Sequence, residues 1–109
     1  MACYVVTTAV STEYDAENIA LRVVWEGLAA SVKISDARSR FFWKGSYTRR
    51  DEKILTIITS GDIYALLEAR IKELHPYELP EIIATEIDGG SREFLDWIAA
   101  SADGREKPQ

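Results

Sequence analysis

The first quarter of the chain changes from strand-like to helix-like spacing of its apolar residues. Residues 3–8 are rich in Tyr, Val and Thr, which is typical of a β-strand. Helical spacing follows over residues 13–26, where Ser11 or Thr12 can cap the first turn and Gly27 can end the last one. The apolar stripe of this expected helix consists of Ala16, Ile19, Ala20 and Val23.

The middle of the chain predicts a long β-hairpin. A second strand begins in LAASVKIS (28–35) and runs into RSRFFWKGSYTRR (38–50). The dipeptide Lys-Gly at 44–45 can form a two-residue turn in which glycine takes the positive φ. Such a turn would place Phe42 opposite Tyr47 on the neighbouring strand.

The third expected strand, EKILTIITS (52–60), is apolar on both faces. Because side chains alternate along a strand, Leu55 and Ile57 point to one face while Ile54 and Ile58 point to the other. A strand with this pattern is normally covered on both sides.

The remaining sequence predicts two helices separated by a fourth strand. Asp62 is expected to cap the first helix, and Pro76 ends it because the residue before a proline disfavours helical geometry. The apolar stripe of this helix consists of Ile63, Leu66, Leu67, Ile71 and Leu74. The segment EIIATEI (81–87) predicts the fourth strand, and Ser91 is expected to cap a last helix. That last helix carries Phe94, Trp97 and Ile98.

The element order β-α-β-β-α-β with an added C-terminal helix predicts an α+β, ferredoxin-like sandwich. We expect a single domain over residues 1–102 and a flexible polar tail over residues 103–109. Two helices cover only one face of a four-stranded sheet, so the second apolar face of the third strand needs another partner.

Aromatic residues near the hairpin tip predict an interface. Phe41, Phe42, Trp43 and Tyr47 would project from a monomer, and an exposed aromatic patch commonly marks a contact surface. The alternative is that the hairpin arm folds back onto its own sheet. The full set of expected interface residues is Trp25, Phe41, Phe42, Trp43, Tyr47 and Tyr77.

Composition narrows the class of protein. The chain has 109 residues, of which 47% are hydrophobic and 28% charged, which is typical of one globular domain. A net charge of −5 argues against nucleic acid or an anionic membrane as partner. Cys3 is the only cysteine, and there is no signal-peptide pattern or membrane-spanning run, so a cytoplasmic location is expected.

Four segments, in order along the chain, resemble the CutA family of divalent-cation tolerance proteins. They are EGLAASVKI (26–34), FFWKG (41–45), LEARIKELHPYELPEII (67–83) and FLDWI (94–98). The resemblance implies a ferredoxin-like protomer in a tight homotrimer, with hairpin arms that reach neighbouring copies. It also implies a role in the response to divalent metal ions such as copper, which some bacterial members bind.

A metal site would have to use the segment around the only histidine. His75 is a ligand type that suits copper or zinc, and Glu78 and Glu81 are close enough in sequence to assist it. The structural alternative is that His75 hydrogen-bonds the end of the preceding helix. Relative to copper-binding members, Thr7 stands where the resemblance places a cysteine and Leu74 where it places a second histidine, so soft ligands are missing.

Other function classes have less support. A PII-like trimer that binds a nucleotide between subunits shares the expected fold, but it needs a long flexible loop and clustered basic groups. An acylphosphatase-like enzyme would need an arginine after the first strand, where the sequence reads TAVSTE. One histidine does not assemble a recognisable catalytic constellation, so no enzymatic activity is expected.

Overall fold

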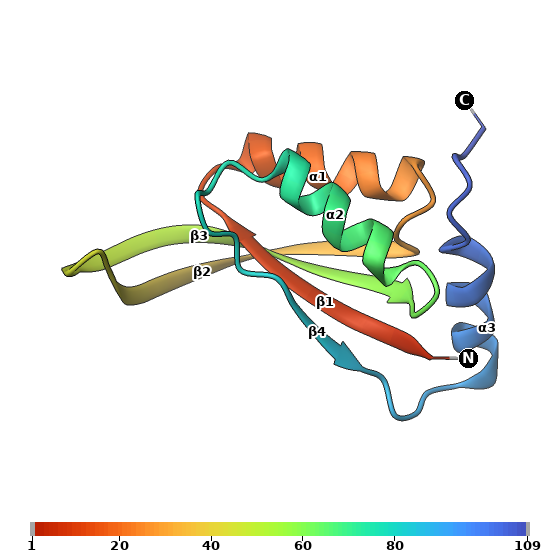
Figure 1. Cartoon of the computed structure of the whole chain (residues 1–109). Helices are drawn as coiled ribbons and strands as arrows, with labels where there is room; N and C mark the ends of the chain where they lie inside the picture. The colour runs from red at the N-terminus through yellow and green to blue at the C-terminus, as the bar shows by residue number, and fades with distance from the viewer. Residues whose placement is uncertain (1, 109) are drawn as a thin grey trace.

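The computed structural model describes residues 2–108 as one α+β unit in which helices pack on an antiparallel sheet (Figure 1). The strand order in the four-stranded sheet is β2-β3-β1-β4. The elements are β1 (Cys3–Val10), α1 (Glu13–Trp25), β2 (Ser31–Trp43), β3 (Ser46–Ser60), α2 (Tyr64–Leu74), β4 (Ile83–Glu86) and α3 (Arg92–Ser101). The expected βαββαβ order with a final helix is therefore confirmed.

Helices α1 and α2 cover one face of the sheet (Figure 1). The core between them and the sheet is built from fully buried side chains, among them Val6, Ile19, Leu55, Ile57, Leu67 and Ile71. Burying a side chain of this size is worth about 1.5–3 kcal/mol, so this layer supplies much of the driving force for folding. Thr12 caps α1, as expected, because its Oγ1 accepts a hydrogen bond of 3.1 Å from the Asp15 N–H.

Two expectations for α2 are wrong. The helix begins after Ile63, whose side chain makes no capping hydrogen bond, so Asp62 is not the cap. Leu66 lies outside the apolar stripe, with 58% of its surface exposed. The residues of α2 that do reach the core, Leu67 and Ile71, are four apart and share one side of the helix.

The β2–β3 hairpin forms an arm that projects from the body of the molecule (Figure 1). Its turn has the expected geometry, with φ values of +49° at Lys44 and +81° at Gly45. The register places Phe42 opposite Tyr47, and their rings meet edge to face at 5.8 Å. The alternative in which the arm folds back onto its own sheet is not observed.

The second face of the sheet, which we call the open face, carries apolar side chains on either side of a central pair of threonines. Residues directly opposite each other in antiparallel strands point the same way, so the register defines this face. Its central residues are Val5, Thr7, Ile54, Thr56, Ile58 and Ile83. One end is covered by the α3 region, where Ile98 and Ala102 pack against Cys3 and Ala30, and the other end is covered at Glu52 by Tyr77 of the loop that follows α2. The two-faced pattern predicted for β3 is thus confirmed, and within the described residues no helix covers the middle of the second face, whose β1 and β3 side chains are half-buried.

The C-terminal segment expected to be flexible is hydrogen-bonded to the end of α1. The Gly104 N–H donates to the Gly27 carbonyl at 2.9 Å, and the Lys107 N–H donates to the Trp25 carbonyl at 2.7 Å. A Cβ atom on Gly27 would lie 2.1 Å from the Arg105 carbonyl oxygen. Glycine at position 27 therefore both ends the helix, with φ +74°, and admits the tail.

Candidate functional site

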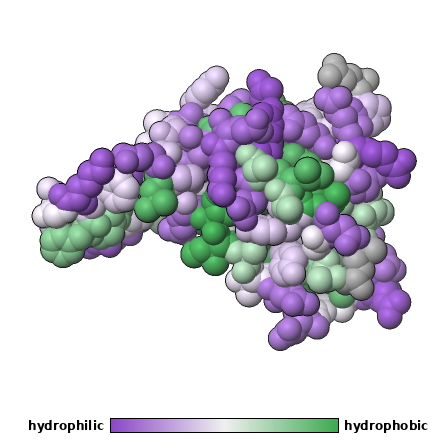
Figure 2. All heavy atoms as spheres, in the orientation of Figure 1, coloured by the Kyte–Doolittle hydropathy of each residue, from purple (hydrophilic) through white to green (hydrophobic). Residues whose placement is uncertain are grey.

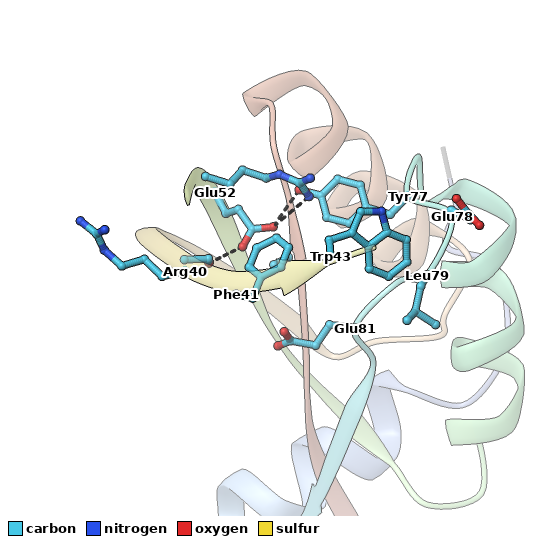
Figure 3. Close-up of a pocket in the computed structure, with 11 residues that line it drawn as sticks. Arg40, Phe41, Trp43, Glu52, Tyr77, Glu78, Leu79 and Glu81 are labelled. Atoms are coloured by element: carbon cyan, nitrogen blue, oxygen red, sulfur yellow. Dashed lines mark hydrogen bonds and ion pairs between the residues drawn. The ribbon is translucent and has the colours of Figure 1, made fainter. Parts of the chain in front are cut away.

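A cavity of about 550 Å³ lies where the arm meets the loop between α2 and β4 (Figure 3). The side chains that shape it come from β2, β3 and that loop, and they include Phe41, Trp43, Arg50, Glu52, Tyr77 and Glu81. Ser35 and Ile54 are opposite each other on the open face. Phe41 and Trp43 lie an even number of residues after Ser35, and Arg50 and Glu52 lie an even number of residues before Ile54. Because side chains alternate along a strand, all four also lie on the open face. The cavity is therefore the outward continuation of the uncovered side of the sheet.

Glu52 is the buried polar centre of this region, with 8% of its surface exposed. Its carboxylate accepts a hydrogen bond of 2.7 Å from the Tyr77 hydroxyl and another from the Ser39 hydroxyl. Burial, followed by the hydrogen bond to Glu52, raises the pKa of Tyr77 above its ordinary value. Tyr77 is therefore a neutral donor that ties the loop to the arm.

Arg50 fills the space between two aromatic rings at the wall of the cavity. Its guanidinium carbon lies 5.4 Å from the centre of the Phe41 ring and 4.7 Å from that of Tyr77. Its Nη1 is 4.0 Å from Glu52 Oε2. Cation–π contacts of this kind contribute about 0.5–1 kcal/mol each where partly exposed. The charge of Arg50 is thus largely balanced within the chain.

His75 is buried at the end of α2 and uses both ring nitrogens inside the chain. Nε2 lies 2.9 Å from the Ala9 carbonyl oxygen, and the Tyr77 N–H donates to Nδ1 at 3.2 Å. A carbonyl oxygen only accepts and Nδ1 accepts here, so the ring is the neutral tautomer with its proton on Nε2. Burial lowers the pKa of His75 below its ordinary value. The ring therefore joins β1, α2 and the following loop.

The three residues expected to bind a metal do not meet at one point. The two nitrogens of His75 are occupied, and Glu78 pairs with Lys44 at 3.1 Å on the rim of the arm. Glu78 and Glu81 both line the cavity, and both side chains are exposed (Figure 3). Over residues 2–108, no cluster of three or more His, Cys, Asp or Glu side chains could hold a metal ion. Among the described residues of a single chain, His75, Glu78 and Glu81 thus do not come together as a copper or zinc centre.

The expected interface residues separate into three places. Phe41, Trp43 and Tyr77 are half-buried around the cavity. Phe42 and Tyr47 lie on the opposite side of the arm and are 74% and 58% exposed. The sixth residue, Trp25, is exposed at the far end of α1.

Sequence reasoning did not single out Ser39, Arg50 and Glu52. The only signal was the spacing of Arg50 and Glu52 two residues apart, which places them on one face of β3. That spacing does not predict that Tyr77, 25 residues later in the chain, covers the Glu52 carboxylate.

Replacing His75 by glutamine is expected to remove one component of acid sensitivity. In the unfolded chain the histidine has an ordinary pKa near 6.5, and in the folded chain the pKa is lower. As pH falls through 6.5, the unfolded state binds a proton that the folded state does not, so the wild type loses stability by up to about 1.4 kcal/mol per pH unit until the folded pKa is reached. The free energy of unfolding of both proteins, measured from pH 8 to pH 5, tests this. Parallel profiles would contradict it.

No helix in the described part of the chain is long and apolar enough to cross a membrane. Apolar side chains instead gather where the arm joins the body of the molecule (Figure 2). Leu79, which lines the cavity, and Ile83 at the start of β4 are 68% and 54% exposed. An apolar surface of this kind is typical of a contact site.

An α+β sandwich with an uncovered sheet face and a long hairpin arm defines the structural class, and comparison with known proteins gives the family. The family model described as CutA1 divalent ion tolerance protein matches residues 4–101. The divalent-cation tolerance protein CutA of Thermus thermophilus is 39% identical over 95 residues, which cover 86% of this chain and 92% of the relative. The CutA protein of Archaeoglobus fulgidus is 37% identical, with 87% and 92% of the two chains covered. The chain belongs to the CutA1 family.

Solved structures agree with this assignment. The Thermus thermophilus protein superposes with a TM-score of 0.87 at 38% identity, covering 91% of this chain and 97% of the other. CutA of Xylella fastidiosa gives a TM-score of 0.90 at 33% identity, covering 93% and 98%. The Archaeoglobus fulgidus protein, described as a periplasmic divalent cation tolerance protein, gives 0.88 at 31% identity, covering 94% and 99%.

Proposed function

We propose that this chain works as a homotrimeric divalent-cation tolerance protein whose functional unit is the assembly. The observation that carries the proposal is the open face, where Ile54, Ile58 and Val5 form an apolar surface that α3 covers at one end only. A neighbouring copy packed on that face would remove its apolar surface from water. The assembly would gain about 25 cal/mol of free energy for each Å² of apolar area buried. The number of copies, three, follows from the family resemblance.

The arm supports the same proposal. Phe41 and Trp43 lie on the side of the arm that continues the open face, so a copy packed on that face would also meet them. The arm extends beyond the body of its own chain (Figure 1), and its turn contacts that body through the exposed Lys44–Glu78 ion pair. A projecting aromatic arm of this kind is suited to reaching a neighbouring copy.

A divalent cation such as copper or zinc would need ligands from more than one copy. His75, Glu78 and Glu81 of one chain do not converge, and the nitrogens of His75 are already hydrogen-bonded. A site at a subunit boundary would draw on exposed carboxylates beside β4, such as Glu81. In the response to metal ions, any direct contact with a metal ion would therefore lie between subunits.

The PII-like alternative is not favoured. The arm ends in a two-residue turn rather than a long loop, and the family match covers nearly the whole chain. The absence of enzymatic activity and a cytoplasmic location stay predictions from the sequence. The Archaeoglobus fulgidus relative is described as periplasmic.

A deletion strain challenged with copper tests the proposal. The wild-type chain is expected to restore growth, whereas a variant with Ile54 and Ile83 replaced by glutamate is not, because it would not assemble. A matched variant with Leu21 and Leu66 replaced by glutamate alters exposed helix positions and should restore growth like the wild type. Restoration by the open-face variant to the wild-type level would contradict the proposal.

A further inference from the structure

The chain contains two Asp-Gly dipeptides, at 88–89 and at 103–104, and their surroundings in the fold differ. In such a dipeptide the aspartate carboxyl group lies next to the backbone nitrogen of a residue that has no Cβ atom to shield it. That nitrogen can attack the side-chain carbon and close a five-membered imide ring. Ring closure requires the main chain to leave its ordinary conformation, so hydrogen bonds that hold the dipeptide in place slow the reaction.

The dipeptide at 103–104 has both of its reacting groups occupied. The Gly104 N–H, whose nitrogen would have to attack, donates to the Gly27 carbonyl at 2.9 Å. Both carboxylate oxygens of Asp103 accept from Arg105, Oδ1 from the backbone N–H at 2.9 Å and Oδ2 from Nε at 3.1 Å. The hydrogen bond from the Arg105 backbone lowers the pKa of Asp103, which keeps the carboxyl group ionised and without a hydroxyl group to lose.

The dipeptide at 88–89 lies between β4 and α3, at the end of the sheet opposite the arm (Figure 1). The chain is fixed on either side of it, because the Ile87 N–H donates to the Cys3 carbonyl at 2.9 Å and Ser91 caps α3. Asp88 and Gly89 themselves are exposed, and within residues 2–108 no hydrogen bond or ion pair ends on the Asp88 carboxylate or the Gly89 N–H. A Cβ atom on Gly89 would meet no heavy atom of a non-adjacent residue within 4 Å. Both reacting groups thus have room to move.

The homotrimer proposed above uses other surfaces. Its contacts are the middle of the open face and the arm, whereas Asp88 follows the end of β4 that lies beside Cys3, where Ile98 of α3 already packs. The reaction also takes place within one chain, so no group from a neighbouring copy takes part.

We propose that Asp88 is a site of spontaneous isoaspartate formation and that Asp103 is protected from it. The Gly89 nitrogen forms a bond to Cγ of Asp88, while the carboxyl hydroxyl group and the amide proton leave together as water. A water molecule then opens the imide ring. Cleavage at the main-chain carbonyl gives isoaspartate, in which the main chain continues through Cγ, and cleavage at Cγ restores aspartate. No group is oxidised or reduced, and the mass of the chain is unchanged.

The product differs from the original chain in two ways. The main chain between β4 and α3 is longer by one methylene group, and the former main-chain carbonyl becomes a free α-carboxylate. That carboxylate is the group that an isoaspartyl methyltransferase accepts as its substrate. This modification goes beyond metal tolerance and does not depend on it.

Ageing the intact protein at neutral pH and physiological temperature tests the proposal. Tandem mass spectrometry with electron-transfer dissociation locates isoaspartate, and methyl transfer from S-adenosylmethionine by an isoaspartyl methyltransferase measures its total amount. Isoaspartate is expected to be about tenfold more abundant at position 88 than at position 103, because the hydrogen bonds at position 103 must break first. Synthetic peptides of residues 84–94 and 99–108 lack these hydrogen bonds and are expected to react at similar rates.

Gly89→Ala and Gly90→Ala form a matched pair in the same loop. The first places a Cβ atom beside the attacking nitrogen, in open space, and is expected to lose most of the isoaspartate at position 88. The second makes the same change one residue later, where the Cβ atom would lie 3.4 Å from Leu95 Cδ2. It leaves the attacking nitrogen unshielded, so accumulation is expected to match the wild type.

Three outcomes would overturn the proposal. The first is no excess of isoaspartate at position 88 over position 103 in the aged protein. The second is equal accumulation in Gly89→Ala and Gly90→Ala, which would exclude the nitrogen of residue 89 as the attacking group. The third is a difference between the two peptides as large as that in the protein, because the local sequence rather than the fold would then set the preference.

Discussion

Replacing Ile54 and Ile83 together by glutamate is expected to convert the assembled protein into single chains of 12.3 kDa. Both side chains lie on the open face, at its centre and at its β4 edge. In an assembly, each copy would bury two unpaired carboxylates, whose desolvation costs several kcal/mol per charge. In a single chain position 83 is exposed and position 54 is half-buried on the open face, so both carboxylates can reach water and the fold itself is expected to persist. Sedimentation velocity gives the mass, and circular dichroism checks the fold.

The control for this variant replaces Leu21 and Leu66 by glutamate. These leucines lie on α1 and α2 and are 56% and 58% exposed, close to the 54% exposure of Ile83. They are on the helical side of the molecule, so the control is expected to keep the wild-type mass. Dissociation of both variants alike would mean that added charge, rather than loss of the open face, caused the change.

Replacing Glu52 by alanine is expected to lower the free energy of unfolding by about 2 kcal/mol. The substitution leaves the Tyr77 and Ser39 hydroxyls without their acceptor and removes the nearest negative charge from Arg50. Losing one partner of a hydrogen bond to a charged group costs about 1.5–3 kcal/mol. Because this network joins the loop to the arm, the amide signals of residues 75–82 are also expected to broaden.

Asp51 provides the matched control on the same strand. Its side chain points to the other side of the arm, is 77% exposed and pairs with Arg49 at 3.5 Å. Exposed ion pairs contribute about 0–1 kcal/mol, so Asp51→Ala is expected to change stability by no more than about 0.5 kcal/mol. Chemical denaturation at one fixed protein concentration compares the variants. An equal loss for both would show that Glu52 has no special role.

Local patterns along the chain were sufficient to predict most of the fold. Alternation in β3 correctly assigned Leu55 and Ile57 to one face and Ile54 to the other, because that pattern depends only on strand geometry. The turn at Lys44-Gly45 was predictable for the same reason. Asp62 failed as a cap because α2 begins one residue later than expected, which puts Ile63 in the capping position, and local patterns do not fix a helix start to one residue.

The candidate site was much less predictable, because it depends on contacts between distant segments. The sequence around Glu52 reads TRRDE, a run of charges that resembles an ordinary solvated arm. That carboxylate becomes a buried acceptor because Tyr77, in the loop after α2, packs against the arm and donates a hydrogen bond to it. His75 likewise finds its acceptor on Ala9, 66 residues away, so its structural role could be raised as an alternative but not decided.

The mass of the unmodified protein in solution tests the central claim most directly. Sedimentation equilibrium at micromolar concentration is expected to give three times the chain mass of 12.3 kDa, about 37 kDa, because the open face and the arm need neighbouring copies as cover. A stable particle of 12.3 kDa at that concentration would show that the apolar face tolerates water, and it would contradict the account.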